Sequence, residues 1–461
     1  MSILSFFTEA SRLSRCTSRA SHLASRTIRY VLLLFIGASA WAVAQASESA
    51  RALTLAEALR IAESRSGALA AQDAATRSSR ERAIAASQLP DPTLQLAIDN
   101  LPVNGEMGFR LTDDFMTMRS VGFMQTYTRK EKRSARRAEF EREADVSQST
   151  RAVFLAELRE QTALAWFELY YQQQLLDLMV DQRDESQHQV KAAEAAFRGG
   201  RGSEADVFSA RSMVARIENN LHELRAGVTN AQAALARWTG ASIPFRLGEP
   251  PSIHQTLFAS HSLDHRVDQH PELALMTAEE RVALARAEAA RQEKRADWTW
   301  SLMVSQRGSE YSDMVSVGVS IPLQWNQKRR QDREVAAQLA RVDQVRAERE
   351  EMRRSHRLEI QQLLTNWRAQ LARLEGYNKT LIPLATQRSQ AALAAYQGGK
   401  EPLDAVLEAR RIEIETRVER LQIEMEAAAL WTELEFLIPV PSLIETPAAP
   451  SFVSPTLEQN P

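Results

Sequence analysis

The stretch "AAFRGGRGSEADVFSAR", residues 195–211, returns as "AAYQGGKEPLDAVLEAR" at residues 394–410, an offset of 199 residues. In each copy a Gly-Gly pair interrupts sequence rich in Ala, Leu, Glu and Arg, which are residues that favour helix. Glycine also supplies the left-handed backbone conformation with which a sharp helix reversal begins. Each copy therefore predicts two long helices that are joined by a tight turn.

A second pair of similar segments lies upstream of these turns. "SVGFMQTYTRKEKR" (120–133) returns as "SVGVSIPLQWNQKR" (316–329), an offset of 196 residues. Because both pairs occur in the same order, the chain is predicted to be an internal duplication. The expected boundaries are a first structural repeat at 47–250 with its helical tip at 199–201, and a second at 251–445 with its tip at 398–400.

The segments between the repeated motifs are predicted to be very long helices. There is no Gly or Pro between Phe123 and Arg198, and the helical part of that stretch would be about 100 Å long. Apolar residues in both halves follow a three-four spacing that is typical of coiled-coil packing seams. These residues are Leu155, Leu158, Ala165, Leu169, Leu176 and Met179 in the first half, and Leu407, Ile414, Val418, Leu421, Met425 and Ala428 in the second.

Four short segments instead alternate between apolar and other residues, which is the period of a β-strand. They form two predicted hairpins, one at about 93–128 and one at about 297–324. Each strand is about ten residues long, the length of a tilted membrane strand. The fold class is therefore expected to be mainly α with a small β part. Two interpretations of the hairpins are open: membrane strands, or amphipathic hairpins that rest on a soluble core.

Residues 1–46 are expected to be a secretory signal. Five arginines precede an apolar run from Val31 to Ala44, and small residues at 44 and 46 offer cleavage sites. An uncleaved anchor is the alternative, although the run is short for a membrane span. The single cysteine, Cys16, lies before the run, so the exported chain is expected to have no disulfide and no thiolate. The proline-rich segment 446–461 is expected to be a disordered tail.

The sequence offers no catalytic site. It lacks the H-E-x-x-H, G-x-S-x-G, P-loop and dinucleotide-binding patterns, so we expect no enzyme activity and no cofactor. A formal net charge of −2 gives no reason to expect nucleic-acid binding. Four histidines, His254, His261, His265 and His270, gather at the joint where the second repeat begins. No second ligand type clearly accompanies them, so no metal site is predicted there.

The duplicated helix–hairpin–helix plan, the two Gly-Gly turns and "SVGVSIPL" (316–323) resemble the TolC family of outer-membrane efflux channels. The resemblance implies a homotrimer that forms a twelve-strand transmembrane β-barrel in the outer membrane, with a long α-barrel that extends into the periplasm. It also implies an exit duct that works with a periplasmic adaptor protein and an inner-membrane efflux pump. Four strands cannot close a barrel, and closure is compulsory in lipid, so a contribution from several chains is expected on physical grounds as well.

The resemblance carries over to both Gly-Gly turns. In the family, the matching turns form the periplasmic tip that meets the adaptor. This implies six contact residues: Phe197, Gly199, Gly200, Tyr396, Gly398 and Gly399. On turn chemistry alone, a plain reversal between two helices explains the same residues.

Just beyond the turns, the family places the constellation that closes its pore. The matching acidic candidates here are Asp206, Asp404 and Glu408, and Arg211 and Arg410 are candidate partners in closed-state salt bridges. Three-fold symmetry would turn each acidic position into a ring of like charge that attracts cations. Ordinary solvated helix charges remain the alternative.

The sequence says less about the transported substrate than about the fold. The segment from Asp99 to Gln125 resembles the first hairpin of the family's heavy-metal efflux branch. It contains Met107, Met116, Met118 and Met124, and thioethers suit soft ions, although methionine also fills packing sites. A periplasmic adaptor and a structural coiled-coil protein of the cell envelope are alternative functions. An adaptor would have one helical hairpin with β-rich flanks, and a coiled-coil protein leaves the paired strands unexplained.

Overall fold

The computed structural model describes residues 52–240, 246–256, 258 and 266–438, and the predicted signal and tail lie outside them. The chain forms two compact units. In the first, Leu53 pairs with Leu247 in an isolated parallel bridge, and the amide of Leu53 donates to the carbonyl of Arg246 at 2.7 Å. The second unit, residues 54–243 and 249–461, contains the helices and strands named below.

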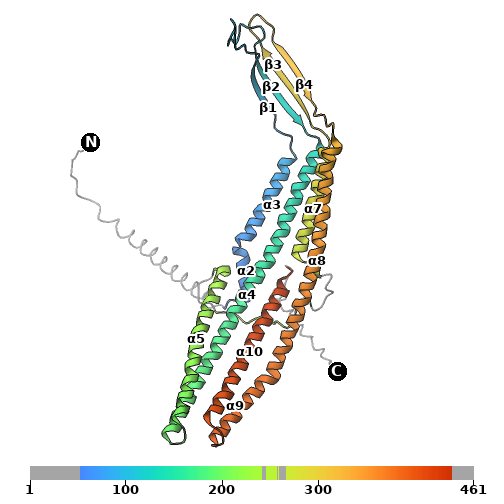
Figure 1. Cartoon of the computed structure of the whole chain (residues 1–461). Coiled ribbons are helices and arrows are strands. Elements are labelled where there is room, and N and C mark those ends of the chain that lie inside the picture. The colour runs from blue at the N-terminus through green and yellow to red at the C-terminus, as the bar shows by residue number, and fades with distance from the viewer. Residues whose placement is uncertain (1–51, 241–245, 257, 259–265, 439–461) are drawn as a thin grey trace, which may run out of the picture. The chain divides into compact units, whose positions relative to one another are not determined.

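The 69-residue helix α4 (Lys130–Arg198) is the longest element of the larger unit and is about 100 Å long. It contacts α2 (Leu55–Arg65), α3 (Gly67–Ala86), α5 (Glu204–Thr239) and α7 (Pro271–Glu293). Figure 1 shows α3 and α7 beside the half of α4 nearest the strands, and α5 beside the other half. The prediction of one uninterrupted helix across this stretch is confirmed.

The second long helical stretch follows a short 3-10 turn (Gln327–Arg329). It consists of α8 (Gln331–Gly376), a π-helical turn (Tyr377–Leu381) and α9 (Ile382–Gln397). In the π turn the amide of Ile382 donates to the carbonyl of Tyr377. Pro383 follows at once, has no amide hydrogen and crowds the preceding helical turn, which explains the local widening. The last helix is α10 (Leu403–Phe436), which contacts α8, α9 and α4.

Large aromatic side chains fill the core where α4 meets α10. Trp166, Phe167 and Trp431 are each at most 2% exposed, and the rings of Phe167 and Trp431 meet edge to face with centroids 5.9 Å apart. The indole nitrogen of Trp431 donates to the carbonyl of Gln255 at 2.7 Å, and that of Trp367 donates to the carbonyl of Ile253 at 3.1 Å. Both indole donors therefore keep a hydrogen-bond partner when they are buried. The two bonds also hold residues 253–255 against α8 and α10.

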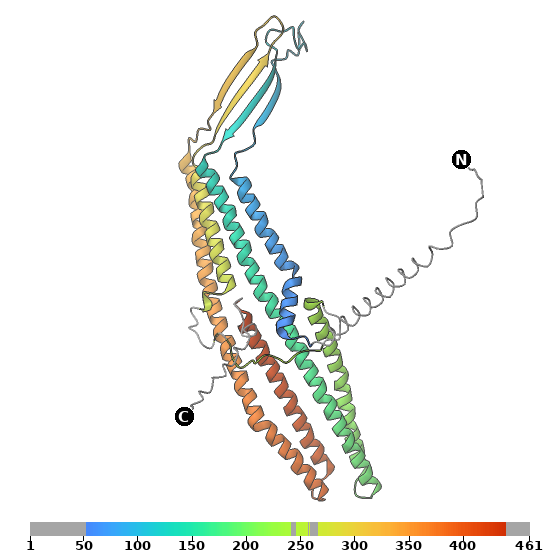
Figure 2. The same ribbon diagram turned by 180° about the vertical axis from the view of Figure 1, so that it is seen from behind.

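The four predicted strands form one antiparallel sheet in the order β1-β2-β3-β4. The strands are β1 (Thr93–Asp99), β2 (Met118–Tyr127), β3 (Trp298–Gln306) and β4 (Met314–Ser320). The two hairpins are joined through β2 and β3, and Figure 2 shows the sheet at one end of the long helices. β1 and β4 end before Pro102 and Pro322, which cannot donate to a ladder. The prediction of a mainly helical fold with a small β part is confirmed.

Among the described residues, no helix has both the length and the apolar character needed to cross a bilayer.

Candidate functional site

The sheet presents a continuous, exposed apolar face. Cross-strand partners share a face, and one row of partners is Leu96, Val121, Val304 and Val315. A second row runs through Leu94, Phe123, Leu302 and Val317. Leu96 is 72% exposed and Val317 is 77% exposed, which is extreme for aliphatic side chains at strand centres. Exposed apolar surface of this extent marks a place of contact with lipid or protein.

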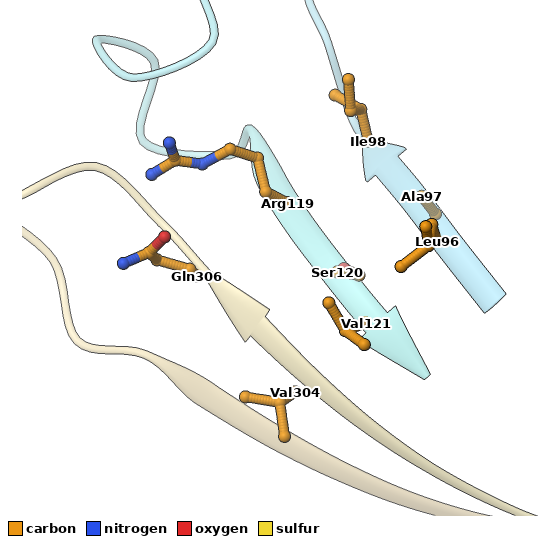
Figure 3. A pocket seen from close by; sticks show the side chains of 8 residues that line it. All are labelled: Leu96, Ala97, Ile98, Arg119, Ser120, Val121, Val304 and Gln306. Atoms are coloured by element: carbon orange, nitrogen blue, oxygen red, sulfur yellow. The ribbon is translucent and has the colours of Figure 1, made fainter. Parts of the chain in front are cut away.

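Part of this face forms a hollow of about 530 Å³ over β1, β2 and β3. Figure 3 shows Leu96, Val121 and Val304 along it, with Arg119 and Gln306 near one end. The guanidinium of Arg119 also donates to the carbonyl of Arg307 at 3.4 Å. The apolar band therefore ends in polar side chains where the strands reach their loops.

The opposite face of the sheet is polar. The hydroxyls of Ser120 and Ser305 lie 2.8 Å apart, and that of Ser120 donates to the carboxylate of Asp99 at 2.6 Å. Further along, the hydroxyls of Thr126 and Thr299 lie 3.0 Å apart. Hence one face of the sheet suits an apolar medium, and the other suits water.

An ionic cluster connects the sheet to the helices. Lys132, at the start of α4, is buried and lies 2.6 Å from Glu293 and 3.0 Å from Asp297, and Arg136 lies 2.6 Å from Glu293. Burial raises the pKa of Glu293, but hydrogen bonds from Lys132 and Arg136 outweigh burial and bring it below its usual value. The cluster ties the first turn of α4 to the end of α7 and to the start of β3.

The two Gly-Gly turns have the same backbone structure. The first glycine of each pair ends a helix with negative φ, whereas Gly200 and Gly399 have φ values of +69° and +67°. The amide of Gly200 donates to Phe197 at 3.0 Å, and that of Gly399 donates to Tyr396 at 2.9 Å. The predicted left-handed conformation is therefore present, but only at the second glycine of each pair.

The two turns stand on a shared apolar core, which we call the tip cluster. It consists of Ala193 from α4, Val207 and Ala210 from α5, and Leu403, Val406 and Leu407 from α10. Tyr396 packs against this cluster, whereas its repeat equivalent Phe197 is 46% exposed. Of the two predicted aromatic contact residues, Phe197 therefore offers the larger free surface.

Near the tips, a groove of about 820 Å³ runs between α5 and α10. Two of the predicted gate acids, Asp404 and Glu408, line it together with Phe208 and Arg411. Glu408 lies 2.7 Å from Arg411, and the hydrogen bond from Arg411 lowers the pKa of Glu408. Arg411 also contacts Glu415 at 2.5 Å, so this wall of the groove carries alternating charges.

The other predicted gate residues lie outside this groove. Asp206 forms a capping box with Ser203 at the start of α5, where its carboxylate accepts from the Ser203 amide at 2.8 Å. Arg211 pairs with Glu194 of α4 at 2.7 Å. Arg410, which matches Arg211 in the repeat, pairs within α10 with Glu413 at 2.7 Å and lies 4.0 Å from Glu185 of α4. Within one chain, the five predicted residues therefore do not form a single constellation.

Sequence reasoning missed Phe208 and Arg411 as residues of the groove. Phe208 is 59% exposed, whereas its repeat equivalent Leu407 is 9% exposed within the tip cluster. The sequence did carry a signal for Phe208, because the matching position of the second repeat holds the smaller aliphatic residue Leu407. Arg411 had no comparable signal, because arginines are frequent on these helices.

The four histidines at the start of the second repeat do not form one group in the part of the chain that is described. His261 and His265 lie outside that part, and His254 is exposed. His270 caps α7 by accepting from the amide of Glu272 at 3.2 Å, and its ring stacks on His356 of α8 with centroids 3.8 Å apart. Burial and the neighbouring His356 lower the pKa of His270 to about 3, so its ring is neutral.

The methionines of the first hairpin are spread over two environments. Met107 and Met116 are 42% and 48% exposed and lie in the loop between β1 and β2. Met118 and Met124 lie on β2, paired with Asp99 and with Thr93 and Ser301 on the polar face. This spacing along the hairpin gives no single soft-ion site.

Comparison with solved structures defines the class of protein that has this fold. The outer membrane protein VceC of Vibrio cholerae matches with a TM-score of 0.67 and 16% identity over 83% of this chain and 95% of its own. The outer-membrane channel OprN matches with a TM-score of 0.69 and 15% identity, over 83% and 89%. CusC, a protein that forms a transmembrane channel, gives 0.67 and 14%, over 83% and 91%. The chain therefore has the fold of the TolC-family outer-membrane channels, as the sequence predicted.

The chain is also similar in sequence to a metal-resistance protein. The cobalt-zinc-cadmium resistance protein CzcC of Cupriavidus metallidurans is 28% identical over 302 residues, which are 63% of this chain and 70% of CzcC. No family model matches the chain. The four similar proteins are described as membrane proteins, channels or a resistance protein, and none is described as an enzyme.

Proposed function

We propose that this chain is the outer-membrane exit duct of a tripartite efflux system, with divalent heavy-metal cations as its substrate class. The observation that carries the proposal is the two-faced sheet at one end of the long helices. Its apolar face suits hydrocarbon and its polar face suits a water-filled lumen. The fold of outer-membrane channels and the name of the relative CzcC support the same interpretation.

The sheet edges support a trimer. Within the described residues, β1 and β4 each pair with one strand only, so each has one row of backbone groups without a strand partner. In hydrocarbon every such group must be satisfied, which requires a closed barrel. Three chains supply twelve strands and join β4 of one chain to β1 of the next. The helices below the sheet then form the periplasmic α-barrel.

The helical tips are the surface at which the periplasmic adaptor docks in this proposal, and the adaptor connects the duct to an inner-membrane pump. The two turns share one backbone geometry and one apolar support, so three chains offer six similar docking points. Phe197, Gly199, Gly200, Tyr396, Gly398 and Gly399 are the contact residues. The exposed ring of Phe197 provides the largest apolar surface among them.

The pore gate is proposed to lie just above the tips. Asp404 and Glu408 line the groove between α5 and α10, and three-fold symmetry would repeat each of them around the lumen. Asp206, Arg211 and Arg410 complete the proposed gate. Within one chain they pair with Ser203, Glu194 and Glu413, respectively. Contacts between chains at the gate would have to replace these pairs.

Fractionation with an export assay tests the proposal. We expect the chain in the outer-membrane pellet as a detergent-stable trimer whose gel migration changes on heating. Deletion of the gene should increase cellular accumulation of Zn²⁺, Co²⁺ or Cd²⁺, and the intact gene should restore export. A monomeric chain in the periplasmic fraction would contradict the duct. A membrane trimer without any effect on these cations would contradict only the substrate class.

A further inference from the structure

Two buried histidines meet where α7 begins against α8. His270 is the N-cap residue of α7 and His356 lies within α8, and they are 6% and 7% exposed. Their rings are nearly parallel, at 22°, with centroids 3.8 Å apart. Imidazoles are expensive to bury without polar partners, so the groups around them indicate what the pair can do.

Carboxylates face both ring nitrogens of His356. Nε2 lies 2.9 Å from Oε2 of Glu272, and Nδ1 lies 3.0 Å from Oε2 of Glu359. Glu272 is also close to His270, whose Nδ1 accepts from its amide. Ligand atoms of His270, Glu272 and His356 all lie within 4.8 Å of one another. Glu272 is 42% exposed in its side chain, which leaves the group open to solvent on that side.

We propose that His270, Glu272 and His356 form a binding site for one divalent transition-metal ion of borderline softness, such as Zn²⁺ or Co²⁺. Two imidazoles and one carboxylate are a ligand set that suits these ions, whereas Cu(I) and Ag(I) prefer sulfur. A fourth position is left for water on the exposed side, as in an open zinc site.

Binding requires a movement of Glu272 and a rotation of the His270 ring. Bonds of about 2.0–2.2 Å place two ligand atoms of a tetrahedral Zn²⁺ ion about 3.4 Å apart. Separations of up to 4.8 Å in the group must therefore shrink, and the 2.9 Å between Nε2 of His356 and Oε2 of Glu272 must widen by about 0.5 Å. The side chain of Glu272 can supply that movement, because it is half exposed. His270 must turn out of the stack, since stacked rings direct their lone pairs side by side. That turn gives up the 3.2 Å bond from the Glu272 amide, whose net value is about 1 kcal/mol.

Glu359 supplies the outer support that metal-binding histidines commonly have. Its carboxylate lies 3.0 Å from Nδ1 of His356, and in the tautomer with the proton on Nδ1 the lone pair of Nε2 is the one that would bind an ion. A metal ion at Nε2 would take the place of any proton between Nε2 and Glu272, and that proton would be released on binding. Removal of such an outer carboxylate typically weakens metal affinity about 10- to 100-fold.

The wider surroundings are acidic. Glu160 of α4 and Glu433 of α10 both have raised pKa values, through burial first and then through neighbouring carboxylates that include Glu359. Glu359 therefore has carboxylate neighbours on two other helices, α4 and α10. The site lies in the helical part of the chain, and the inference does not depend on the proposed duct, because binding is measurable on the purified protein.

Metal titration of the full chain in detergent, prepared with an affinity tag that contains no histidine, tests the site. We expect wild type to bind one Zn²⁺ per chain by calorimetry and to show visible Co²⁺ absorption of a four-coordinate site. His356→Ala should abolish this binding, and Glu359→Gln should weaken it about 10- to 100-fold. His254→Ala is the matched control, because it removes an exposed histidine outside the cluster and should change nothing.

Glu272→Gln separates metal binding from folding. Glutamine keeps the size and can still hydrogen-bond to His356, so the Tm in EDTA should stay close to that of wild type. Zn²⁺ should raise the Tm of wild type and leave that of Glu272→Gln unchanged. The site is overturned if wild type binds no Zn²⁺, or if His356→Ala and Glu272→Gln bind it with wild-type affinity.

Discussion

Valine at both Gly200 and Gly399 should disable the tips without unfolding the helices that carry them. Both glycines have φ near +70°, and a Cβ at either position would meet nothing within 4 Å. The cost is therefore one of backbone conformation alone. Left-handed geometry costs an L-residue about 1–2 kcal/mol, so two turns cost roughly 2–4 kcal/mol per chain, and β-branching adds to this.

That cost is large for a turn but falls short of a typical global stability of about 5–15 kcal/mol. We therefore expect the double variant to form trimers, to show faster amide hydrogen exchange at the tips, and to lose export. Gly376→Ala is the matched control: Gly376 also has open space around it, but its φ is −61° within a helix. There alanine should stabilise the chain by about 0.5–1 kcal/mol. Wild-type exchange and export in the double variant would refute this reasoning.

Four further outcomes are expected. Val317→Asp with Val319→Asp should block membrane insertion, because each lipid-facing charge costs on the order of a few kcal/mol; normal trimers in outer-membrane fractions would contradict this. Glu408→Ala should leave assembly intact but reduce cation preference in planar bilayers. Asp206→Asn should reduce it further, and asparagine is the better change because Asp206 caps α5; unchanged selectivity in both variants would exclude these acids from the pore. Burial and neighbouring carboxylates raise the folded-state pKa of Glu160, so its contribution to stability is complete below the unfolded-state pKa and is lost as pH rises. Glu160→Gln should accordingly raise the Tm more at pH 8 than at pH 5 in thermal unfolding.

Much of the fold was predictable from the sequence, because its strongest signals are local. The alternation of apolar residues locates the strands, and the Gly-Gly pairs locate both reversals, since only glycine adopts φ near +70° without strain. The strand ends were predicted less well. Ile321 and Leu323 continue the alternation of the last strand, but Pro322 cannot donate to the ladder, and β4 ends at Ser320.

The site was less predictable, because partners that are distant in sequence decide it. Arg211 and Arg410 match in the repeat, but they have different partners, because Glu194 and Glu413 are not repeat equivalents. His356 lies 86 residues after His270, and no periodic pattern connects them. Only the packing of α7 on α8 brings the two rings together.

The central claim is that sheets from several chains close into one barrel. Disulfide trapping between β1 and β4 is its most direct test. Within one chain these strands are separated by β2 and β3, at about 4.8 Å per step, so they are roughly 14 Å apart and cannot be bridged. Cysteine pairs such as Leu96→Cys with Val317→Cys, tested over neighbouring registers in a Cys16→Ser background, should give covalent species of up to three chains on a non-reducing gel. Chains that remain monomeric in every register would contradict the account.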